Sequence, residues 1–350
     1  MIDYEELRII RERRPASFEP PVKRYSIRWE RSVDLAITAY YGAQAPTKEA
    51  VEQADFKQVM LAAFASDCGP ASVEQGFFVD AAGQYNFVFV AYWLDPLRHE
   101  RWEADSQLHA WWNDPIRLAG TIGLWREVLR VPIERMETLY AYPDYKVGIA
   151  RCPPSTFTLT RNSGYFGAMR DRIPASAVDS LATAMAFPQP VKRHSAGTRW
   201  LVHVPKNLTV IRSGQYWAKC GGEQRTDYLV KMRPLLEKGT AHLGQYPEET
   251  GCLSMRLSRC VEAGGRERDE SFNHAYFLSL AHLEEWSASH RTHLAIWRHA
   301  IEMMKAYGEK RELRTWHEVY VLPEGGQRFE YVNCHPRTGL LPYFEGSRLE

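Results

Sequence analysis

The chain lacks any large excess of charge and any long apolar run. It has 44 Lys and Arg residues against 43 Asp and Glu residues, so its formal net charge is only +1 over 350 residues. Such a balance gives no general attraction to nucleic acid or to anionic lipid. The longest apolar run of strand-like composition, residues 87–94, is far too short to cross a bilayer. The sequence therefore predicts neither a nucleic-acid partner nor a membrane partner.

Cysteine is scarce and is not arranged in pairs. None of the six cysteines belongs to a CxxC motif, and the absence of CxxCH excludes the usual covalent attachment of c-type haem. The histidines, cysteines and acidic residues show no compact set at zinc spacing. The N-terminal residues MIDYEELRII have neither the basic start nor the apolar core of a secretory signal. We therefore expect a reducing, cytoplasmic setting.

What the chain does have is the composition of a globular protein large enough for two core-bearing units, with 45% hydrophobic and 25% charged residues. Residues 1–30 are charged and contain prolines, which predicts an arm without a core of its own. Residues 31–142 and 196–350 alternate predicted strands and helices. Residues 143–195 are rich in Gly and Pro and predict a loop-rich connector.

Periodicity and turn residues predict the order of elements. Helices are expected at residues 47–64, 96–112 and 226–242, and strands at residues 75–80, 85–95, 124–131, 200–204, 208–211 and 252–261, with a strand-to-helix passage at 275–280. The first two strands should form a hairpin around the turn Ala-Ala-Gly-Gln.

Two sets of matching residues indicate an internal duplication. An offset of 184 residues brings Tyr92, Leu94, Glu100, Trp102, Ala104 and His109 onto Tyr276, Leu278, Glu284, Trp286, Ala288 and His293, and an offset of 191 brings Trp125, Glu127, Val128 and Pro132 onto Trp316, Glu318, Val319 and Pro323. We interpret the halves as two ferredoxin-like repeats of an α+β fold, forming a dimeric-α+β-barrel-type core with flanking helices. The alternative is chance similarity between tryptophan-rich segments. Since His317 is matched by Arg126, only one functional site per chain is expected.

One predicted helix carries histidines whose positions differ around its axis. The helix should begin at Thr292 as N-cap and end near Gly308. At about 100° per residue, His293 shares a sector with Ile296, Trp297, Ala300, Ile301, Met303 and Met304. His293 should therefore face the apolar interior, whereas His290 and His299 should be solvated.

The strand predicted after this helix carries another inward-facing histidine. The alternation over residues 313–322 places His317 on one face with Val319 and Val321. Two imidazoles in an apolar space suggest that one binds a ligand while the other performs chemistry. The alternative is two core histidines, each satisfied by a carbonyl group or a buried water.

If His293 binds a metal-containing ligand, haem fits better than a bare zinc ion. A single axial imidazole in an apolar, aromatic pocket suffices for haem iron, whereas zinc needs several ligands. Trp297, Met303 and Met304 could line such a pocket, although residues of these types at helical spacing are more often plain core.

Five runs of sequence resemble the haem-containing aldoxime dehydratases, which convert R-CH=N-OH into a nitrile and water. The runs are THLAIW, HEVYVLP, YVNCHPRTGLLPY, NLTVIRSGQ and GYFGAMRDRIP. The resemblance extends over nearly the whole chain and is strongest from about Arg161 onward. It implies noncovalent haem b with ferrous iron in the active state, an aldoxime substrate and a homodimer.

The resemblance also assigns site residues. It implies that His293 is the proximal haem ligand and His317 the distal acid-base residue. Ser213 matches the serine that hydrogen-bonds the oxime oxygen, Arg172 matches the distal arginine, and Glu137 matches an acidic group that assists the distal histidine. Through Arg172, the connector would contribute to the distal pocket.

Each assignment has an ordinary structural alternative, and one position departs from the family pattern. Ser213 fits a turn beside Gly214, Arg172 could pair with Asp171 or another surface acid, and Glu137 could lie on a solvated helix face. Tyr216 stands where the family pattern has an acidic residue.

The implied mechanism is dehydration at ferrous haem. A protonated His317 would convert the poor hydroxide leaving group into water, and the neutral imidazole would then remove the C-H proton. Ser213 and Arg172 would orient the oxygen. Two alternatives are a haem enzyme of the chlorite-dismutase or dye-peroxidase type, and a haem-binding carrier without catalysis.

Overall fold

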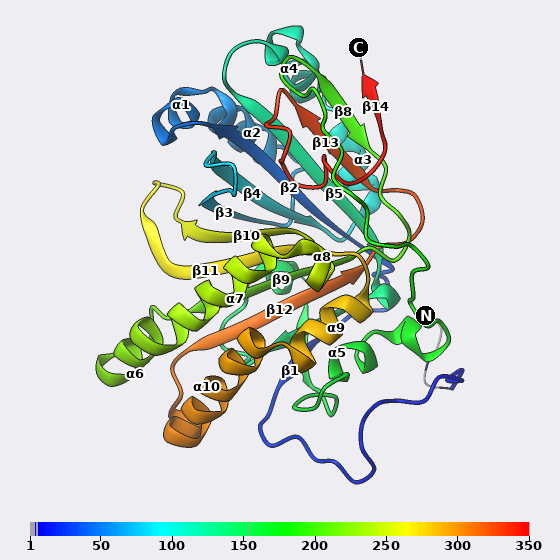
Figure 1. Ribbon diagram of the computed structural model, residues 1–350, viewed down its shortest axis with the longest axis vertical. Coiled ribbons are helices and arrows are strands. Elements are labelled where there is room, and N and C mark those ends of the chain that lie inside the picture. The colour runs from blue at the N-terminus through cyan, green and yellow to red at the C-terminus, as the bar shows by residue number, and fades with distance from the viewer. Residues whose placement is uncertain (1–3, 5, 154, 350) are drawn as a thin grey trace.

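The computed structural model describes residues 4, 6–153 and 155–349, over which fourteen strands form one antiparallel sheet in the order β14-β8-β13-β5-β2-β4-β3-β10-β11-β9-β12-β6-β1-β7 (Figure 1). The strands are β1 (Tyr25–Arg28), β2 (Leu35–Ala45), β3 (Ser72–Val79), β4 (Tyr85–Trp93), β5 (Gly123–Pro132), β6 (Met136–Tyr140), β7 (Thr156–Leu159), β8 (Arg199–Val202), β9 (Thr209–Tyr216), β10 (Cys252–Val261), β11 (Glu267–Phe277), β12 (Arg314–Val321), β13 (Arg328–Val332) and β14 (Gly346–Leu349). The antiparallel sheet with separate helices is an α+β architecture, as predicted.

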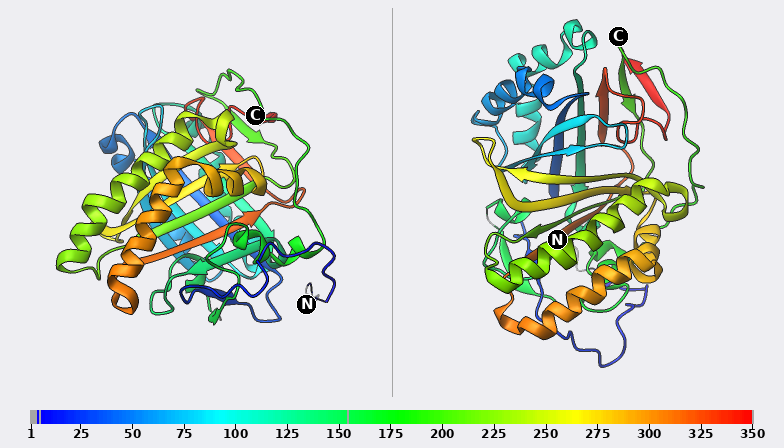
Figure 2. Two further views of the ribbon diagram at one scale, coloured as in Figure 1. Left: turned by 60° about the horizontal axis from the view of Figure 1, so that its bottom comes forward. Right: turned by 60° about the vertical axis from the view of Figure 1, so that its left-hand side comes forward.

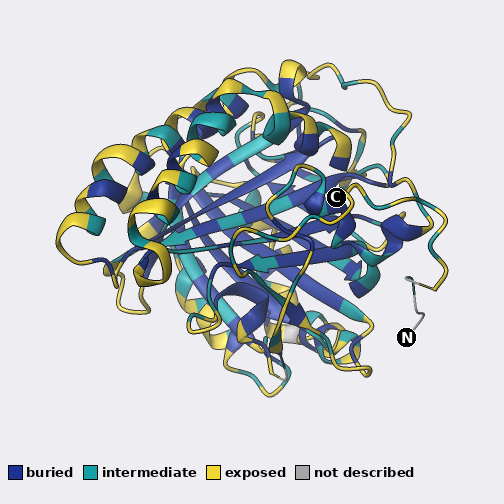
Figure 3. Cartoon of the chain, turned by 90° about the horizontal axis from the view of Figure 1, so that it is seen from below, coloured by how far each residue is buried: buried dark blue, intermediate teal, exposed yellow. Residues whose placement is uncertain are grey.

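Helices connect the strands and cover the sheet. They are α1 (Lys48–Gln53), α2 (Phe56–Phe64), α3 (Pro96–Glu103), α4 (Ser106–Asn113), α5 (Ala168–Asp171), α6 (Gly222–Asp227), α7 (Arg233–Gln245), α8 (Pro247–Thr250), α9 (Leu280–Ser289) and α10 (Arg291–Tyr307). A π-helical turn, Tyr228–Met232, joins α6 to α7. In Figures 1 and 2, α7 and α10 run side by side across the strands of the second half, and Figure 3 shows that their outer faces are exposed while the strands beneath are mostly buried.

The sheet contains two groups of four strands with the same internal order. Numbered along the chain within each group, both β5-β2-β4-β3 and β12-β9-β11-β10 have the order 4-1-3-2. Helices join the first strand of each group to the second, and the third to the fourth. The two groups meet where β3 pairs with β10. Beyond them, β13, β8 and β14 extend the sheet beside β5, whereas β6, β1 and β7 extend it beside β12.

The central core lies between the two groups and is joined by polar side chains that cross from one to the other. The Tyr92 hydroxyl, from β4, donates to the buried Glu318 carboxylate of β12 at 3.0 Å. The Tyr276 hydroxyl, from β11, donates to the buried Glu127 carboxylate of β5 at 2.8 Å. The two tyrosines match each other at the offset of 184 residues, and the two glutamates match each other at the offset of 191. Each tyrosine contacts the glutamate of the other group of strands.

A glycine and a tryptophan pack together at equivalent places in both groups. Gly42 of β2 lies opposite Trp125 of β5, and Gly214 of β9 lies opposite Trp316 of β12. A Cβ atom at either glycine would overlap the indole ring. The indoles are buried and fill the central core.

Replacing Gly42 with Ala should therefore destabilise the protein by about 1–3 kcal/mol, because the added methyl displaces a packed indole. Gly244→Ala is the matched control, since that glycine lies in α7 with open space around it. It should be neutral or stabilising, because alanine favours the helix. Guanidinium unfolding of both variants measures the difference. Equal stabilities would contradict the packing argument.

Several predicted elements are confirmed, and others were wrong in length. The hairpin of β3 and β4 and the strands β5 and β10 are where periodicity placed them. The two helices predicted at residues 47–64 and 96–112 are each broken into two. The second break occurs because the Asp105 side chain accepts hydrogen bonds from the backbone of Gln107 and Leu108 and so starts a new helix. In the described part of the chain, no helix combines the length and apolarity needed to span a bilayer.

Candidate active site

A cavity of about 550 Å³ lies between the helices of the second half and the outer face of its sheet. Its walls come from α7, α9 and α10 on one side and from β6, β9, β11 and β12 on the other, with the connector closing one edge. A second cavity of about 290 Å³ adjoins it and shares several lining residues. The residues common to both are Leu139, Ser213, Gln215, Leu236, His293, Ile296, Trp297 and His317. The volume and the largely apolar lining suit a small-molecule or cofactor site.

His293 faces this cavity from α10, as its helical phase predicted. The predicted cap was wrong by two residues. The cap is His290, whose ring nitrogen accepts from the backbone N-H of Thr292 at 3.3 Å, while Thr292 lies within the first turn and is buried. His290 is half-buried rather than solvated.

His299 is also buried, contrary to the prediction that it is solvated. Only 8% of it is exposed, and its ring lies 3.6 Å from Asp227 and 3.1 Å from Glu302. His299 is covered because α10 also packs against the end of α6, where Asp227 lies beside its ring. The apolar sector predicted around His293 does not include this contact, and for that reason His299 was predicted to be solvated.

The imidazole of His293 is held in its neutral form. Burial lowers its pKa to about 4, and the nearby backbone of Ser287 only partly opposes this. Its Nδ1 atom is buried without a hydrogen-bond partner. The edge of the Trp286 ring packs against it with centroids 4.7 Å apart. A neutral, desolvated imidazole is the form that donates a lone pair to a metal.

Of the residues predicted to line a pocket with His293, Trp297 does so and is 41% exposed. Met303 and Met304 are absent from the described residues that line either cavity. Met303 packs in the cluster between α10 and α6, and the Met304 sulfur accepts a hydrogen bond from Arg24 at 3.2 Å. The two methionines therefore do not take the suggested role in the pocket lining, and Met303 is a core residue, which was the ordinary interpretation.

His317 lies on the opposite side of the cavity, in contact with two charged side chains. Its Nε2 atom is 2.9 Å from Oε1 of Glu137 and 3.1 Å from Nη2 of Arg172. Arg172 Nε also donates to Glu137 Oε2 at 2.7 Å, and its Nη1 donates to the carbonyl of Asn162. The Glu137 side chain is fully buried behind the other two.

Glu137 is not on a solvated helix face, and Arg172 is not in a surface ion pair. Glu137 lies on the strand β6 rather than on a helix. Because β6 pairs with β12, Glu137 lies opposite Val319 of β12. Arg172 does not pair with Asp171. The Asp171 carboxylate instead accepts from the backbone N-H groups of Arg13 and Arg14 and from the Tyr165 hydroxyl.

Glu137 stays ionised in this setting. Burial raises the pKa of its carboxyl, but the positive charge of Arg172 and the neighbouring His317 outweigh burial and lower the pKa to about 2. The Nε2 atom of His317 therefore faces an acceptor, Glu137, and a donor, Arg172. A protonated Nε2 can donate to the carboxylate, and an unprotonated one can accept from the guanidinium. Both protonation states of His317 have a partner.

Replacing Glu137 with Gln should remove a pH-dependent part of the stability. The pKa is lowered from 4.5 to about 2 on folding, so the carboxylate stabilises the folded state above pH 4.5. That stabilisation, about 3 kcal/mol at neutral pH, is lost as the pH falls toward 2. Free energies of unfolding measured from pH 7 down to pH 4 should fall more steeply for the wild type than for the variant. Glu262→Gln, in an exposed ion pair with Arg266, is the control and should leave the slope nearly unchanged.

Ser213 lies beside His317 because their strands are paired. On β9 it is opposite His317 of β12 on one side and opposite Asn273 of β11 on the other. The Asn273 amide lies 3.5 Å from the Ser213 hydroxyl, and Gln215 follows on the same face. Sequence reasoning missed Asn273, because the strand was predicted to start only at residue 275. The period-two pattern, extended from Ala275, would have placed Asn273 on the cavity face.

Tyr216, where the family pattern has an acidic residue, lies at the end of β9. Its ring stacks on Tyr145 with centroids 4.0 Å apart. It is not among the described residues that line either cavity.

A family model described as haem-containing dehydratase matches residues 39–340. The chain belongs to this family. The chain is similar to a phenylacetaldoxime dehydratase of Bacillus sp. (strain OxB-1), to which it is 34% identical over 339 residues, covering 96% of this chain and 95% of that protein. An aliphatic aldoxime dehydratase of Pseudomonas chlororaphis is 32% identical over 337 residues, covering 95% and 94%.

The chain is also similar to solved structures of aldoxime dehydratases. A crystal structure of an aldoxime dehydratase superposes with a TM-score of 0.88 at 32% identity, covering 95% of each chain. A crystal structure of an aldoxime dehydratase in complex with butyraldoxime also has a TM-score of 0.88, at 31% identity, and covers 95% of this chain and 92% of that one.

The residues of the cavity fit a haem group. His293 offers a neutral imidazole that lines the cavity. Leu236, Ile296 and Trp297 provide the apolar surface that a porphyrin needs. The two imidazoles of the cavity come from opposite walls, and a single axial imidazole suits haem iron better than a metal ion that needs several protein ligands.

Proposed function

We propose that this chain is an aldoxime dehydratase that uses haem b to convert R-CH=N-OH into a nitrile and water. The relatives named for this activity span nearly the whole chain, and one related structure contains butyraldoxime. The observation that carries the proposal is the contact of His317 Nε2 with both a carboxylate and a guanidinium. A group of that kind can release a proton and take one back in the same turnover.

His293 is the proposed proximal ligand of the haem. Its neutral state, its half-buried position and its place on the wall opposite His317 support this role. Ferrous haem held there would supply a Lewis acid for the nitrogen of the oxime. The proton transfers are carried out by the side chains that face the cavity from the sheet.

His317 is the proposed general acid and base. Hydroxide is a poor leaving group, so a proton from His317 must reach the oxime oxygen as the N-O bond breaks and water leaves. The neutral imidazole then accepts the proton from the C-H group, which completes the nitrile and restores His317. One proton is delivered and one is recovered, with no net oxidation or reduction.

Glu137, Arg172 and Ser213 support this transfer. The ionised Glu137 stabilises the protonated imidazole at 2.9 Å, and Arg172 can donate to the neutral one at 3.1 Å. Ser213, one strand away, lines the cavity and can donate a hydrogen bond to the oxime oxygen. A carrier that only holds haem has no need for this buried set of charges.

The direct test is anaerobic reduction of the haem-loaded protein, followed by addition of alkyl and arylalkyl aldoximes and chromatographic detection of nitrile. Ferrous protein should form nitrile, and the ferric protein measured in parallel is the control. A haem-loaded ferrous protein that forms no nitrile from any aldoxime of the panel would favour the haem carrier. Turnover of peroxide or chlorite in place of aldoxime would favour the chlorite-dismutase or dye-peroxidase type.

We also propose that the chain contains two ferredoxin-like repeats. Residues 31–142 and 196–350 each contribute one ferredoxin-like repeat to a barrel-type core, with residues 1–30 as an arm. The shared 4-1-3-2 order and the reciprocal contacts of Tyr92 with Glu318 and of Tyr276 with Glu127 support this duplication. The connector, residues 143–195, contributes Arg172 to the pocket.

We further propose that the protein is cytoplasmic and forms a homodimer. All six cysteines carry free thiols, which supports a reducing, cytoplasmic location. The family resemblance supports a homodimer, which sedimentation equilibrium would test.

A further inference from the structure

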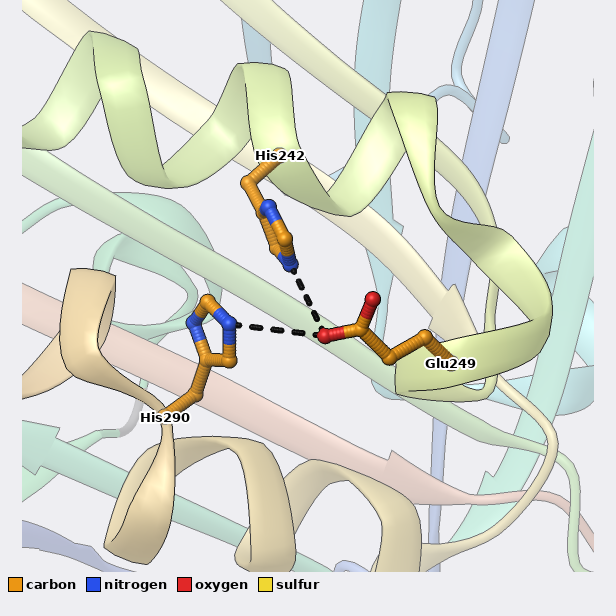
Figure 4. Close-up of side chains that lie close together, drawn as sticks. All are labelled: His242, Glu249 and His290. Atoms are coloured by element: carbon orange, nitrogen blue, oxygen red, sulfur yellow. Dashed lines mark ion pairs between the residues drawn. The ribbon is translucent and has the colours of Figure 1, made fainter.

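Three metal-binding side chains meet at the end of the helical layer. His242 lies near the end of α7, Glu249 lies in α8, and His290 caps α10 (Figure 4). His242 Nε2 is 3.4 Å from Glu249 Oε1, and His290 Nε2 is 3.6 Å from the same oxygen. The three candidate ligand atoms all lie within 4.8 Å of one another.

These separations suit metal ligands better than hydrogen bonds. A hydrogen bond between nitrogen and oxygen has a length of about 2.7–3.2 Å, which both contacts exceed. Two ligand atoms bound at about 2.0–2.1 Å to a tetrahedral zinc ion are about 3.3 Å apart. The contacts of both histidines with Glu249 therefore have nearly the spacing that an ion between them requires.

The two imidazoles are already oriented with their Nε2 atoms toward the carboxylate (Figure 4). The rings stack with centroids 4.1 Å apart. His242 Nε2 is buried and has no hydrogen-bond partner. His290 Nδ1 lies 2.8 Å from the Thr292 hydroxyl. As the N-cap, Nδ1 accepts from the Thr292 backbone N-H. The ion would select the other tautomer, in which Nδ1 donates to the Thr292 hydroxyl and Nε2 keeps a free lone pair for the metal.

The cluster is open to solvent on the side of Glu249. Glu249 is the exposed member, with 57% of its side chain accessible. An ion at this place could thus enter from solvent and complete its coordination with water.

We propose that His242, Glu249 and His290 bind one divalent transition-metal ion of the zinc type. Two imidazoles with one carboxylate favour zinc over magnesium or calcium, which prefer oxygen ligands. The ion would join α7 and α8 to the first turn of α10, three residues before His293. It would act as a structural clamp that holds the helix carrying His293 against α7, and it does not depend on the proposed function.

The test uses the haem-loaded protein dialysed against micromolar zinc chloride, with zinc and iron measured together by elemental mass spectrometry. We expect one zinc ion per chain in the wild type. His242→Gln and Glu249→Gln should each weaken zinc binding at least about tenfold. His109→Gln, which removes an exposed histidine of α4, is the matched control and should bind zinc like the wild type.

Folding is checked separately. Glu249 is exposed, so its replacement should leave the fold intact, and His290→Asn removes the ligand while keeping a good N-cap residue. The haem absorption spectrum reports whether each variant retains its pocket. Zinc should also raise the melting temperature of the wild type and of His109→Gln, but not that of Glu249→Gln. A wild type that binds no zinc, or ligand variants that bind it as tightly as the wild type, would overturn the proposal.

Discussion

His293→Ala should be purified without haem, because it removes the only imidazole of α10 that faces the cavity among the described residues. The remaining apolar walls can still contact a porphyrin, but they offer no axial ligand to the iron. The variant should lack the Soret band after reconstitution with haem, measured by absorption spectroscopy and by extraction of the haem as its pyridine complex. Added imidazole should restore part of the band by entering the space that the side chain leaves.

His299→Ala is the matched control for this experiment. It removes a buried imidazole from the same helix, but that ring lies near Asp227 and Glu302 rather than in the cavity. It should retain haem even if it loses some stability. A His293→Ala protein with an unchanged Soret band would show that another side chain binds the iron.

His317→Ala should retain haem and lose at least about two orders of magnitude in the rate of nitrile formation, as expected for removal of a general acid-base. The substitution leaves Glu137 and Arg172 paired at 2.7 Å, so the pocket should keep its shape. Steady-state rates of the ferrous protein and the haem spectrum, measured on the same preparation, separate the two effects.

The control for His317 is His203→Ala, which removes a histidine that contacts Ser347 beside β8, outside both cavities. Its rate should equal that of the wild type. If His317→Ala kept a rate within a few-fold of the wild type, the proton would have to come from another group. If it lost haem as well, its role would be to hold the pocket rather than to transfer protons.

Local periodicity was sufficient to place both histidines. The 3.6-residue period of the helix directs His293 inward, and the two-residue period of the strand puts His317 on the face of Val319. Both follow from neighbours only a few positions away, and for that reason the sequence predicted them. The resemblance to known dehydratases added Ser213, Arg172 and Glu137, but it gave no reason why these residues should meet.

Only the tertiary structure decided which side chains touch. Glu137 reaches His317 because β6 pairs with β12 across 180 positions of sequence, and Arg172 arrives from the connector. The burial of His299 depends on the second surface against which α10 packs. The cluster of His242, Glu249 and His290 likewise joins separate helices. The periodicity of a helix or a strand is visible in the sequence of that element alone. Contacts between distant segments depend on how the elements pair and pack.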